Sequence, residues 1–404
     1  MTDVNPVESP NPTVPGGHFL PSRFSAGPPS PAPLRRRRPG LVWGIIGTAA
    51  AAVAIGALQL SANLGYDSAE EQYTATAETA IEEQAAVRAA GDELRTTADA
   101  ASLLLESDTA GLIDAGRAEA LAAAGTAASD ALAAAEPLIA EPVLSPARKP
   151  SWFWELFGAT DALTRQSTDA ANLTAQLRDE SDDIAAADTA LDASGMDALA
   201  SAAATAGGLE SAHVSARNDS VIALRGAVED VSATVALDAQ AVDAFSSLQV
   251  ASARLVESEN AELAEKAGPL LSARLEVEAF ARSIAPGVLL EFDWAPIVNG
   301  YGYDGGMGGY TTWWWDEPGR AVIELSDSVA EQWPNARSQA LVVHEVGHAI
   351  SVKCADMYDA STQDSIEKWA TAWAISMGYT DDANGVWAYG YPPQNYIDAA
   401  AGCR

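Results

Sequence analysis

Histidine, lysine and cysteine are scarce in this chain of 404 residues, which holds four histidines, four lysines and two cysteines. The 56 acidic residues outnumber the 23 basic ones and give a formal net charge of −33. Proteins bind nucleic acids largely through Lys and Arg contacts to phosphate, so this balance argues against a nucleic-acid partner. Cys354 and Cys403 are too few for a disulfide framework, but they allow a single bridge if this part of the chain lies outside the cell.

Proline is nearly absent from long stretches of the chain, because ten of the 21 prolines fall within residues 1–40. Together with Ser, Gly and Asn they give a composition that cannot bury a core. We therefore expect residues 1–40 to form a disordered cytoplasmic tail. This tail ends in four consecutive arginines, Arg35–Arg38, and carries a net charge of +3 in an otherwise acidic chain.

Residues 41–58 carry neither a charged nor an amide side chain. This length just spans the hydrocarbon core of a bilayer, so we expect a transmembrane helix over residues 41–62. The positive-inside bias then places the N-terminus in the cytoplasm and the C-terminal domain outside the cell membrane. A cleaved signal peptide is the alternative, but the apolar run is longer than usual, follows a tail and lacks a clean A-x-A site.

Residues 66–284 are rich in Ala, Asp, Glu, Ser and Thr, which together with few breakers predict long helices. Prolines between Pro137 and Pro150, the pair Gly207-Gly208 and the pair Gly268-Pro269 divide this acidic extracellular region into about four helical pieces. Such pieces are typical of an elongated antiparallel bundle, and we find no clear fixed-period repeat in them. The aromatic segment 151–157 is expected to plug a bundle end, with a membrane surface or a partner as the alternative contact.

Tryptophan becomes frequent from Pro286 onward, where eight of the eleven tryptophans lie. Residues 288–294, 309–315 and 320–326 resemble strands, and residues 316–319 a turn between the last two. The glycine-rich residues 300–309 predict a flexible hairpin loop and are too irregular for a phosphate-binding fingerprint. The chain as a whole is therefore expected to be mainly α, with a small α+β domain over residues 286–404.

The clearest motif is His344-Glu345-Val346-Gly347-His348, on a helix predicted to begin, well capped, at Pro334-Asn335. Two histidines four residues apart leave the same helix face and can bind one zinc ion at about 2.0–2.1 Å. Zinc lowers the pKa of a bound water toward about 7, and Glu345 can take its proton as the water attacks a carbonyl. The alternative is an ordinary helix with two satisfied histidines.

This motif resembles the zincin superfamily of metallopeptidases, and the likeness covers roughly residues 286–404. The metzincin pattern is excluded, because Ser351 and Cys354 replace its glycine and its third histidine. The gluzincin pattern places a glutamate on a following helix, and Glu367 fits it, with the small Ala370 and Ala374 on the same helix face.

The resemblance implies that His344, His348 and Glu367 bind zinc and that Glu345 acts as the general base. Asp364 and Asp359 are the alternative third ligands, although a capping box with Ser361 would already use Asp364.

Two features of the gluzincins differ here. Thr371 replaces the aspartate that orients a histidine ligand, and no third histidine is available to stabilise an oxyanion. A tyrosine could serve in its place, and the candidates are Tyr389, Tyr391 and Tyr396. Zincins bind an extended substrate along the strand that precedes the motif helix, so residues 320–326 are expected to form that edge strand.

Cys354 and Cys403 are expected to form a disulfide outside the cell. The alternative is that the Cys354 thiolate binds zinc. The resemblance thus implies a membrane-anchored zinc peptidase that hydrolyses peptide bonds of extracellular or envelope proteins. The alternative is a non-catalytic envelope protein, in which the helices bind or sense a partner and the terminal domain is a degenerate zincin.

Overall fold

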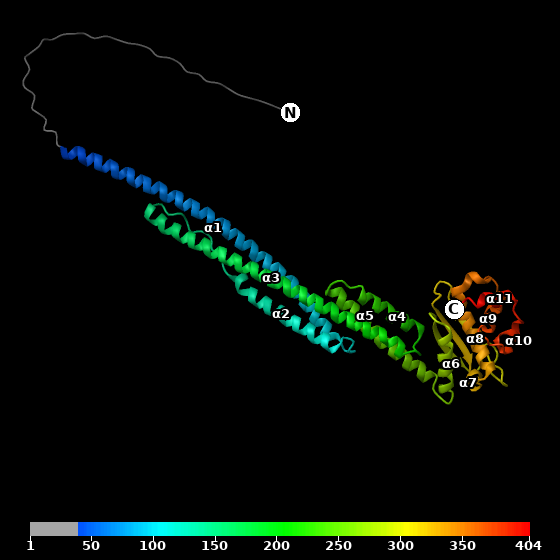
Figure 1. Cartoon of the computed structure of the whole chain (residues 1–404). Helices are drawn as coiled ribbons and strands as arrows, with labels where there is room; N and C mark the ends of the chain where they lie inside the picture. The colour runs from blue at the N-terminus through cyan, green and yellow to red at the C-terminus, as the bar shows by residue number, and fades with distance from the viewer. Residues whose placement is uncertain (1–38) are drawn as a thin grey trace, which may run out of the picture.

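The computed structural model describes residues 39–404, and their side chains from residue 47 onward. Long helices form a rod, and a small mixed domain lies at its far end (Figure 1). The tail predicted for residues 1–40 lies almost wholly outside the described residues. The helices of the rod are α1 (Pro39–Ser107), α2 (Ala115–Ala140), α3 (Phe153–Ala212), α4 (Asn218–Ser232) and α5 (Ala239–Glu265).

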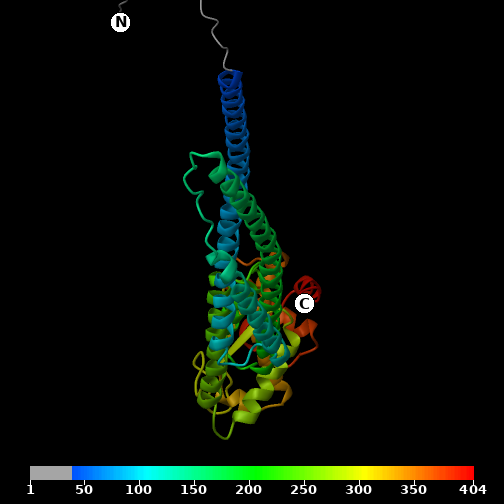
Figure 2. The same ribbon diagram turned by 90° about the vertical axis from the view of Figure 1, so that its left-hand side faces the viewer.

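Helix α1 is continuous over 69 residues, so no loop separates the predicted membrane segment from the first helix of the bundle. Its most apolar window of 18 residues has a mean hydropathy of 1.3 and is only 6% buried. Residues 47–58 are all exposed, and in both views α1 extends alone beyond the rest of the described chain (Figures 1 and 2). The N-terminal part of α1 is therefore a candidate membrane span.

Buried residues recur every seven positions in the rod, although no clear fixed-period repeat was found in the sequence. Alanine occupies four of the thirteen positions named below, which makes the repeat hard to see in the sequence. A heptad repeat produces the left-handed supercoil of coiled coils. The buried residues that recur every seven positions are Tyr66, Tyr73, Ala80, Val87, Leu94 and Ala101 in α1, and Leu156, Leu163, Ala170, Leu177, Ile184, Leu191 and Ala198 in α3.

Helices α1 and α3 run parallel. The expected antiparallel bundle did not include a parallel pair of neighbouring helices. Hydrogen bonds join Thr76 to Ser167 at 3.1 Å and Thr97 to Asp188 at 2.8 Å, and the partners of both pairs are 91 residues apart. The chain can start α3 beside α1 because α2 and the extended connection 141–152 bring it back (Figure 2). Helix α2 runs antiparallel to α1, since Gln84 bonds the Leu138 carbonyl and Gly91 faces Leu132. Helices α4 and α5 pack on α3.

The helix ends differ in part from those expected. The predicted breaks at residues 141–152 and at Gly268-Pro269 are present, whereas Pro137 lies inside α2 and Gly207-Gly208 inside α3. Three further breaks lie at residues 108–114, 213–217 and 233–238. The first and the last of them end in aspartates whose side chains cap the next helix. Asp114 accepts from the amides of Gly116 and Arg117, and Asp238 from that of Ala241. Residues 66–284 therefore form more helices than the four expected pieces.

The C-terminal domain begins before Pro286, because α6 (Leu271–Ile284) packs its buried Val277 and Ala281 into this domain's core. The strands β1 (Leu289–Ala295), β2 (Gly309–Trp313) and β3 (Arg320–Ser326) lie close to the expected positions. The elements that complete the domain are α7 (Asp327–Glu331), α8 (Ala336–Ser351), η1 (Val352–Met357), α9 (Gln363–Ser376), η2 (Asp382–Asn384), α10 (Val386–Tyr389) and α11 (Gln394–Ala400).

The three-stranded sheet has the order β1-β3-β2, with β1 parallel and β2 antiparallel to β3. The expected edge role of residues 320–326 is therefore wrong, because strands pair with β3 on both sides. Strand β2 is the edge strand beside α8. Residues 296–308 connect β1 to β2, and the later strand β3 lies between these two strands.

A buried ionic cluster joins the rod to the C-terminal domain. Lys266 at the end of α5 lies 3.2 Å from Glu262 and 3.1 Å from Glu278 of α6, and all three side chains are almost fully buried. Trp294 of β1 donates a hydrogen bond to Glu278 at 3.1 Å. Removing one partner of a buried ion pair leaves an uncompensated charge, so this cluster fixes how the domain sits on α5.

The aromatic segment 151–157 does not plug the bundle end. Leu156 is fully buried, but Trp152 is 55% exposed, Trp154 58% and Phe157 46%. At the start of α3, the helix face that carries Phe153 and Leu156 packs against α1. The opposite face, which carries the exposed rings, points away from α1.

Cys354 and Cys403 form a disulfide with a Cα–Cα distance of 6.0 Å, as expected, which leaves no free Cys354 thiolate for a metal. The bridge closes a loop that contains α9, and Trp373 of α9 donates a hydrogen bond to the carbonyl of Cys403 at 2.9 Å. It therefore ties the end of the chain to the helix that carries Glu367.

Replacing both cysteines by serine is expected to lower the free energy of unfolding of the C-terminal domain by up to about 4 kcal/mol, because the unfolded loop regains its freedom. Urea titration followed by tryptophan fluorescence measures this, since most tryptophans lie in this domain. The wild-type protein under reducing conditions should give the same midpoint. An unchanged midpoint in the variant would show that the bridge does not stabilise the domain.

Candidate metal centre

Helix α8 supplies two of the three potential ligands from its buried face. Every residue from Val342 to Ser351 is buried, because α8 lies between the sheet and α9. Asn335 occupies the N-cap position, but its side chain makes no capping hydrogen bond, unlike the expected well-capped start. The helix is therefore stabilised by its burial in the domain rather than by its cap.

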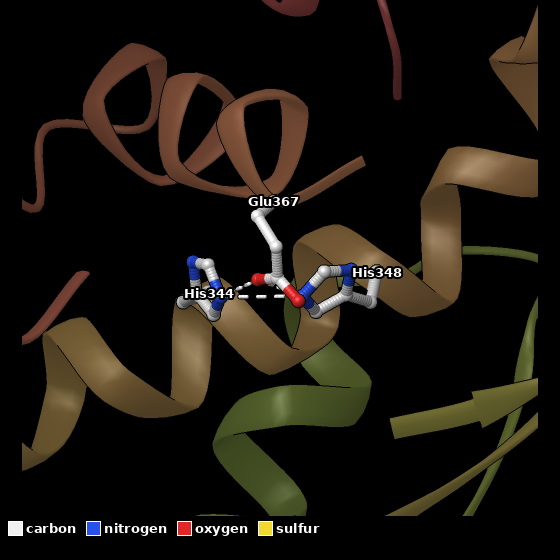
Figure 3. A group of neighbouring side chains, drawn as sticks. All are labelled: His344, His348 and Glu367. Atoms are coloured by element: carbon white, nitrogen blue, oxygen red, sulfur yellow. Dashed lines mark hydrogen bonds and ion pairs between the residues drawn. The ribbon is translucent and has the colours of Figure 1, made fainter. Parts of the chain in front are cut away.

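His344, His348 and Glu367 converge on one point, as Figure 3 shows, with Glu367 extending from α9 toward the two rings of α8. The Nε2 atoms of the histidines are 3.2 Å apart. Oε2 of Glu367 lies 3.3 Å from Nε2 of His344 and 3.2 Å from Nε2 of His348. All three side chains are buried, so this cluster could hold a metal ion.

Small residues allow Glu367 to reach the histidines. A methyl group added to Gly347 would lie 2.9 Å from the carbonyl oxygen of Ala370 and 3.0 Å from its Cα. Backbone therefore packs against backbone where α8 and α9 cross. The prediction that Ala370 lets the two helices approach closely is confirmed, and Gly347 is its counterpart on α8.

Thr371, which stands where gluzincins have an aspartate, contacts His344. Its hydroxyl donates to the carbonyl of Glu367 at 2.8 Å and lies 3.5 Å from Nδ1 of His344. A hydroxyl that donates to a carbonyl can still accept a hydrogen bond from Nδ1–H, which leaves Nε2 free as a ligand. Gly385 covers this contact, since a methyl group there would lie 2.3 Å from the Thr371 hydroxyl.

Aromatic rings hold both imidazoles. His348 stacks on Trp313 of β2 with ring centroids 5.3 Å apart, and His344 stacks on Tyr389 at 6.0 Å. Nδ1 of His348 has no hydrogen-bond partner within residues 39–404. Stacking on Trp313 and the contact of Nε2 with Glu367 therefore orient this ring.

The carboxylate of Glu367 is kept ionised by its partners. Burial alone would raise the pKa of Glu367, but hydrogen bonds with His344 and His348 hold it well below its usual range. Gln363, one turn earlier on α9, donates to the other carboxylate oxygen at 2.7 Å. An ionised carboxylate beside two imidazoles is a typical donor set for a divalent transition metal.

Glu345 points toward β2 beside the cluster. Its Oε2 accepts a hydrogen bond from the Thr311 hydroxyl at 2.7 Å, and its Oε1 lies so close to Gly309 that a methyl group there would be 2.4 Å away. Burial raises the pKa of Glu345, and His344 and Thr311 only partly offset that rise. A raised pKa makes the carboxylate a stronger proton acceptor.

Of the three candidate tyrosines, the structure brings Tyr389 to the site. Burial together with the charge of Glu367 raises the pKa of Tyr389 to about 12, so its phenol stays protonated and can donate a hydrogen bond. Tyr391 is 68% exposed, and Tyr396 forms a 2.7 Å hydrogen bond with Ser365 away from the cluster.

Two adjoining cavities open at the cluster. The larger, of about 280 Å³, extends over α8 toward Tyr301, Trp387 and Arg337. The smaller, of about 100 Å³, follows β2 past Trp313 to Glu367. Both are lined by Asn299, Gly309, His344, Glu345 and Tyr389, so they meet at Glu345.

The alternative ligands do not reach the site. Asp364 forms an ion pair with Lys368 at 2.6 Å, and Asp359 bonds Ser361. The expected capping box is also wrong, because Thr362 caps α9 by accepting from the Ser365 amide.

Sequence reasoning missed Gly309, Thr311, Trp313 and Gly385, since their contacts with the motif residues depend on the packing of distant segments. The Asn384-Gly385 pair was the one local signal, because it favours a positive φ.

None of the protein-family models, curated proteins or solved structures matches this chain. The interpretation of the site therefore rests on its own residues and geometry.

Replacing Gly347 by alanine is expected to push α8 and α9 apart, to destabilise the domain by about 1–3 kcal/mol and to weaken metal binding. Urea unfolding and metal content after dialysis measure both effects. The matched control is Gly207→Ala in α3, where nothing lies within 4 Å of the added methyl group. That change should be neutral or slightly stabilising. Wild-type stability and metal content in Gly347→Ala would contradict the close approach.

Proposed function

We propose that this chain is a membrane-anchored zinc peptidase of the zincin type, with His344, His348 and Glu367 as metal ligands. The observation that carries the proposal is the convergence of two imidazoles and a carboxylate on one point, next to the buried carboxylate of Glu345. Histidines that served only packing would not need their Nε2 atoms 3.2 Å apart. The lone pairs on two unprotonated Nε2 atoms at this distance repel each other unless a proton or a cation lies between them.

The separations of the ligand atoms support zinc. Ligands about 2.0–2.1 Å from a tetrahedral ion are about 3.3–3.4 Å from one another. The three separations in this cluster are 3.2, 3.2 and 3.3 Å. They would therefore fit one face of a zinc tetrahedron, and the cavity beside the three ligand atoms is lined by Glu345 and Tyr389.

A bound zinc ion supplies Lewis-acid polarisation of a carbonyl and a lowered pKa for water. Glu345 is the residue that takes the proton from the attacking water, and Thr311 holds its carboxylate in position. Tyr389 donates a hydrogen bond from its phenolic hydroxyl to the developing oxyanion. Thr371 and Trp313 keep the two imidazoles in orientation while charge develops.

The substrate we propose is an extended peptide added to the free edge of β2. Its backbone would pair with the strand that carries Gly309 and Thr311, next to Glu345. One of its side chains would enter the larger cavity, which is lined mainly by apolar groups together with Arg337 and Asp382. Such binding selects an unfolded or loop segment of a protein.

We place this site outside the cell membrane, with the N-terminus in the cytoplasm. The arginines at 35–38 next to the apolar part of α1 support this orientation. The Cys354–Cys403 bridge supports an oxidising compartment. Helix α3 has 60 residues and spans about 90 Å, so the rod would present the peptidase domain to envelope proteins far from the membrane.

The deciding experiment compares wild-type protein with Glu345→Gln for bound zinc and for cleavage of a mixed peptide library. We expect about one zinc per chain in both proteins. The rate of cleavage by the variant should be lower by about 10²–10⁴-fold, because only the proton acceptor is lost. His348→Ala, the matched control, should lose zinc and activity together.

Two results would contradict the proposal in different ways. A folded wild-type protein without zinc would refute the metal site. Zinc binding without cleavage would favour the alternative of a binding or sensing protein with a degenerate zincin domain.

Replacing Tyr389 by phenylalanine is expected to lower kcat by about 10²–10³-fold and to change KM little, because the lost hydrogen bond forms mainly in the transition state. Steady-state kinetics on one cleaved peptide measures this. Tyr391→Phe is the matched control, since Tyr391 is exposed and should leave kcat unchanged. Equal activity of the Tyr389 variant and wild type would exclude Tyr389 as the oxyanion donor.

A further inference from the structure

Three aromatic side chains at the start of α3, namely Trp152, Trp154 and Phe157, form an exposed group that we call the aromatic patch. They are exposed by 55%, 58% and 46%. The rings of Trp152 and Trp154 stack at 5.2 Å, and Phe153 packs edge-on against Trp154 at 5.0 Å. Buried Leu156 anchors the same turn on α1. The patch is therefore a preformed apolar surface, not a loose loop.

The position of the patch along α1 is fixed by hydrogen bonds to Gln59. The Gln59 side-chain nitrogen donates to the carbonyl of Ser151 at 3.1 Å, and its oxygen accepts from the Phe153 amide at 2.9 Å. Gln59 is the first polar side chain after the uncharged residues 49–58 of the candidate span. The patch thus lies where the apolar part of α1 ends. The ribbon of α3 starts there beside α1 (Figure 2).

The exposed surface of α1 continues the apolar character of the patch. Its large exposed side chains in this region are Val53, Ile55, Leu58, Leu60 and Leu64. The nearby connection contributes Arg148 and Lys149, the one pair of adjacent basic residues between positions 66 and 284. Lys149 pairs with Asp67, the first acidic residue of α1 after the span. Acidic charge is thereby partly neutralised at this end of an otherwise acidic rod.

We propose that the aromatic patch docks into the interfacial layer of the same membrane that α1 crosses. The inference rests on the membrane crossing proposed above, but not on peptidase activity. Tryptophan is enriched at this depth because its ring is apolar while its N–H needs a polar partner. Arg148 would meet the anionic headgroups there.

A lipid surface is the occupant that the geometry favours over a protein. If residues 41–58 fill the hydrocarbon layer, Gln59 lies at its boundary, and side chains bonded beside Gln59 lie in the headgroup layer. A second contact beside α1 then restricts the tilt of the rod. Because the rod is long, a small change in tilt at the patch would move the C-terminal domain by a large distance.

The test places nitroxide labels on the full chain in vesicles of phosphatidylcholine and phosphatidylglycerol. Gly158→Cys reports on the patch without removing an aromatic ring, because Gly158 is exposed with nothing within 4 Å of an added Cβ. Ile55→Cys serves as the lipid reference, and Val235→Cys, at a site 91% exposed on the distal rod, as the water reference. Relative accessibility to oxygen and to a nickel chelate measures the depth of each label.

We expect the Gly158 label to lie between the two references. With Trp152→Ser, Trp154→Ser and Phe157→Ser combined, it should shift to the water value, because the anchoring rings are gone. The matched control replaces Ile222 and Val250, which are 44% and 48% exposed on the distal section, by serine. This control should leave the Gly158 label unchanged, and circular dichroism verifies that all variants remain helical.

Different results would overturn different parts of the inference. A Gly158 label with the water value, beside an Ile55 label in lipid, would refute docking while α1 still crosses the membrane. An Ile55 label with the water value would refute the crossing and the docking together. No shift in the folded triple-serine protein would show that the aromatic patch is not the anchor.

Discussion

Helices α8 and α9 touch backbone to backbone where Gly347 meets Ala370, with room for nothing larger than hydrogen at Gly347. This contact brings Glu367 to the two histidines, although 19 residues separate it from His348. A larger residue at Gly347 would separate the helices and leave the carboxylate short of both imidazoles. The ligand geometry, the low pKa of Glu367 and the position of Thr371 all depend on this approach.

The surrounding structure keeps that contact in place. The Cys354–Cys403 bridge closes the loop that contains α9, and the fully buried Trp369 and Trp373 pack α9 into the core of the domain. On the other side, β2 supplies Gly309 beneath Glu345 and Trp313 against His348. Rigid elements therefore hold each side chain of the proposed zinc site, as catalysis by preorganised groups requires.

Local patterns predicted the residues of the site, because their information lies within one or two helical turns. The spacing of His344 and His348 defines a helix face, and Glu367 follows from small residues on the same face of the next helix. Gly309 and Thr311 could not be predicted in this way. Their contact with Glu345 depends on the order β1-β3-β2, which places β2 rather than β3 at the edge.

The rod shows a similar division. Its helical content follows from composition, but its heptad repeat is hidden because alanines such as Ala80 and Ala170 occupy core positions. The parallel pairing of α1 with α3 depends on the length of α2 and of the connection after it, which no local pattern reports. Exposure of Trp152 and Trp154 likewise depends on which face of α3 meets α1. Local chemistry is thus predictable from the sequence, whereas relations between distant segments require the structure.

X-ray absorption at the zinc edge of the purified full-length protein tests the central claim most directly. Ligation by His344, His348 and Glu367 predicts a shell of nitrogen and oxygen atoms at about 2.0–2.1 Å with the scattering pattern of two imidazoles. The triple variant with alanine at these positions should show no specifically bound zinc. Sulfur scattering at about 2.3 Å, or zinc retained by the triple variant, would contradict the proposed centre.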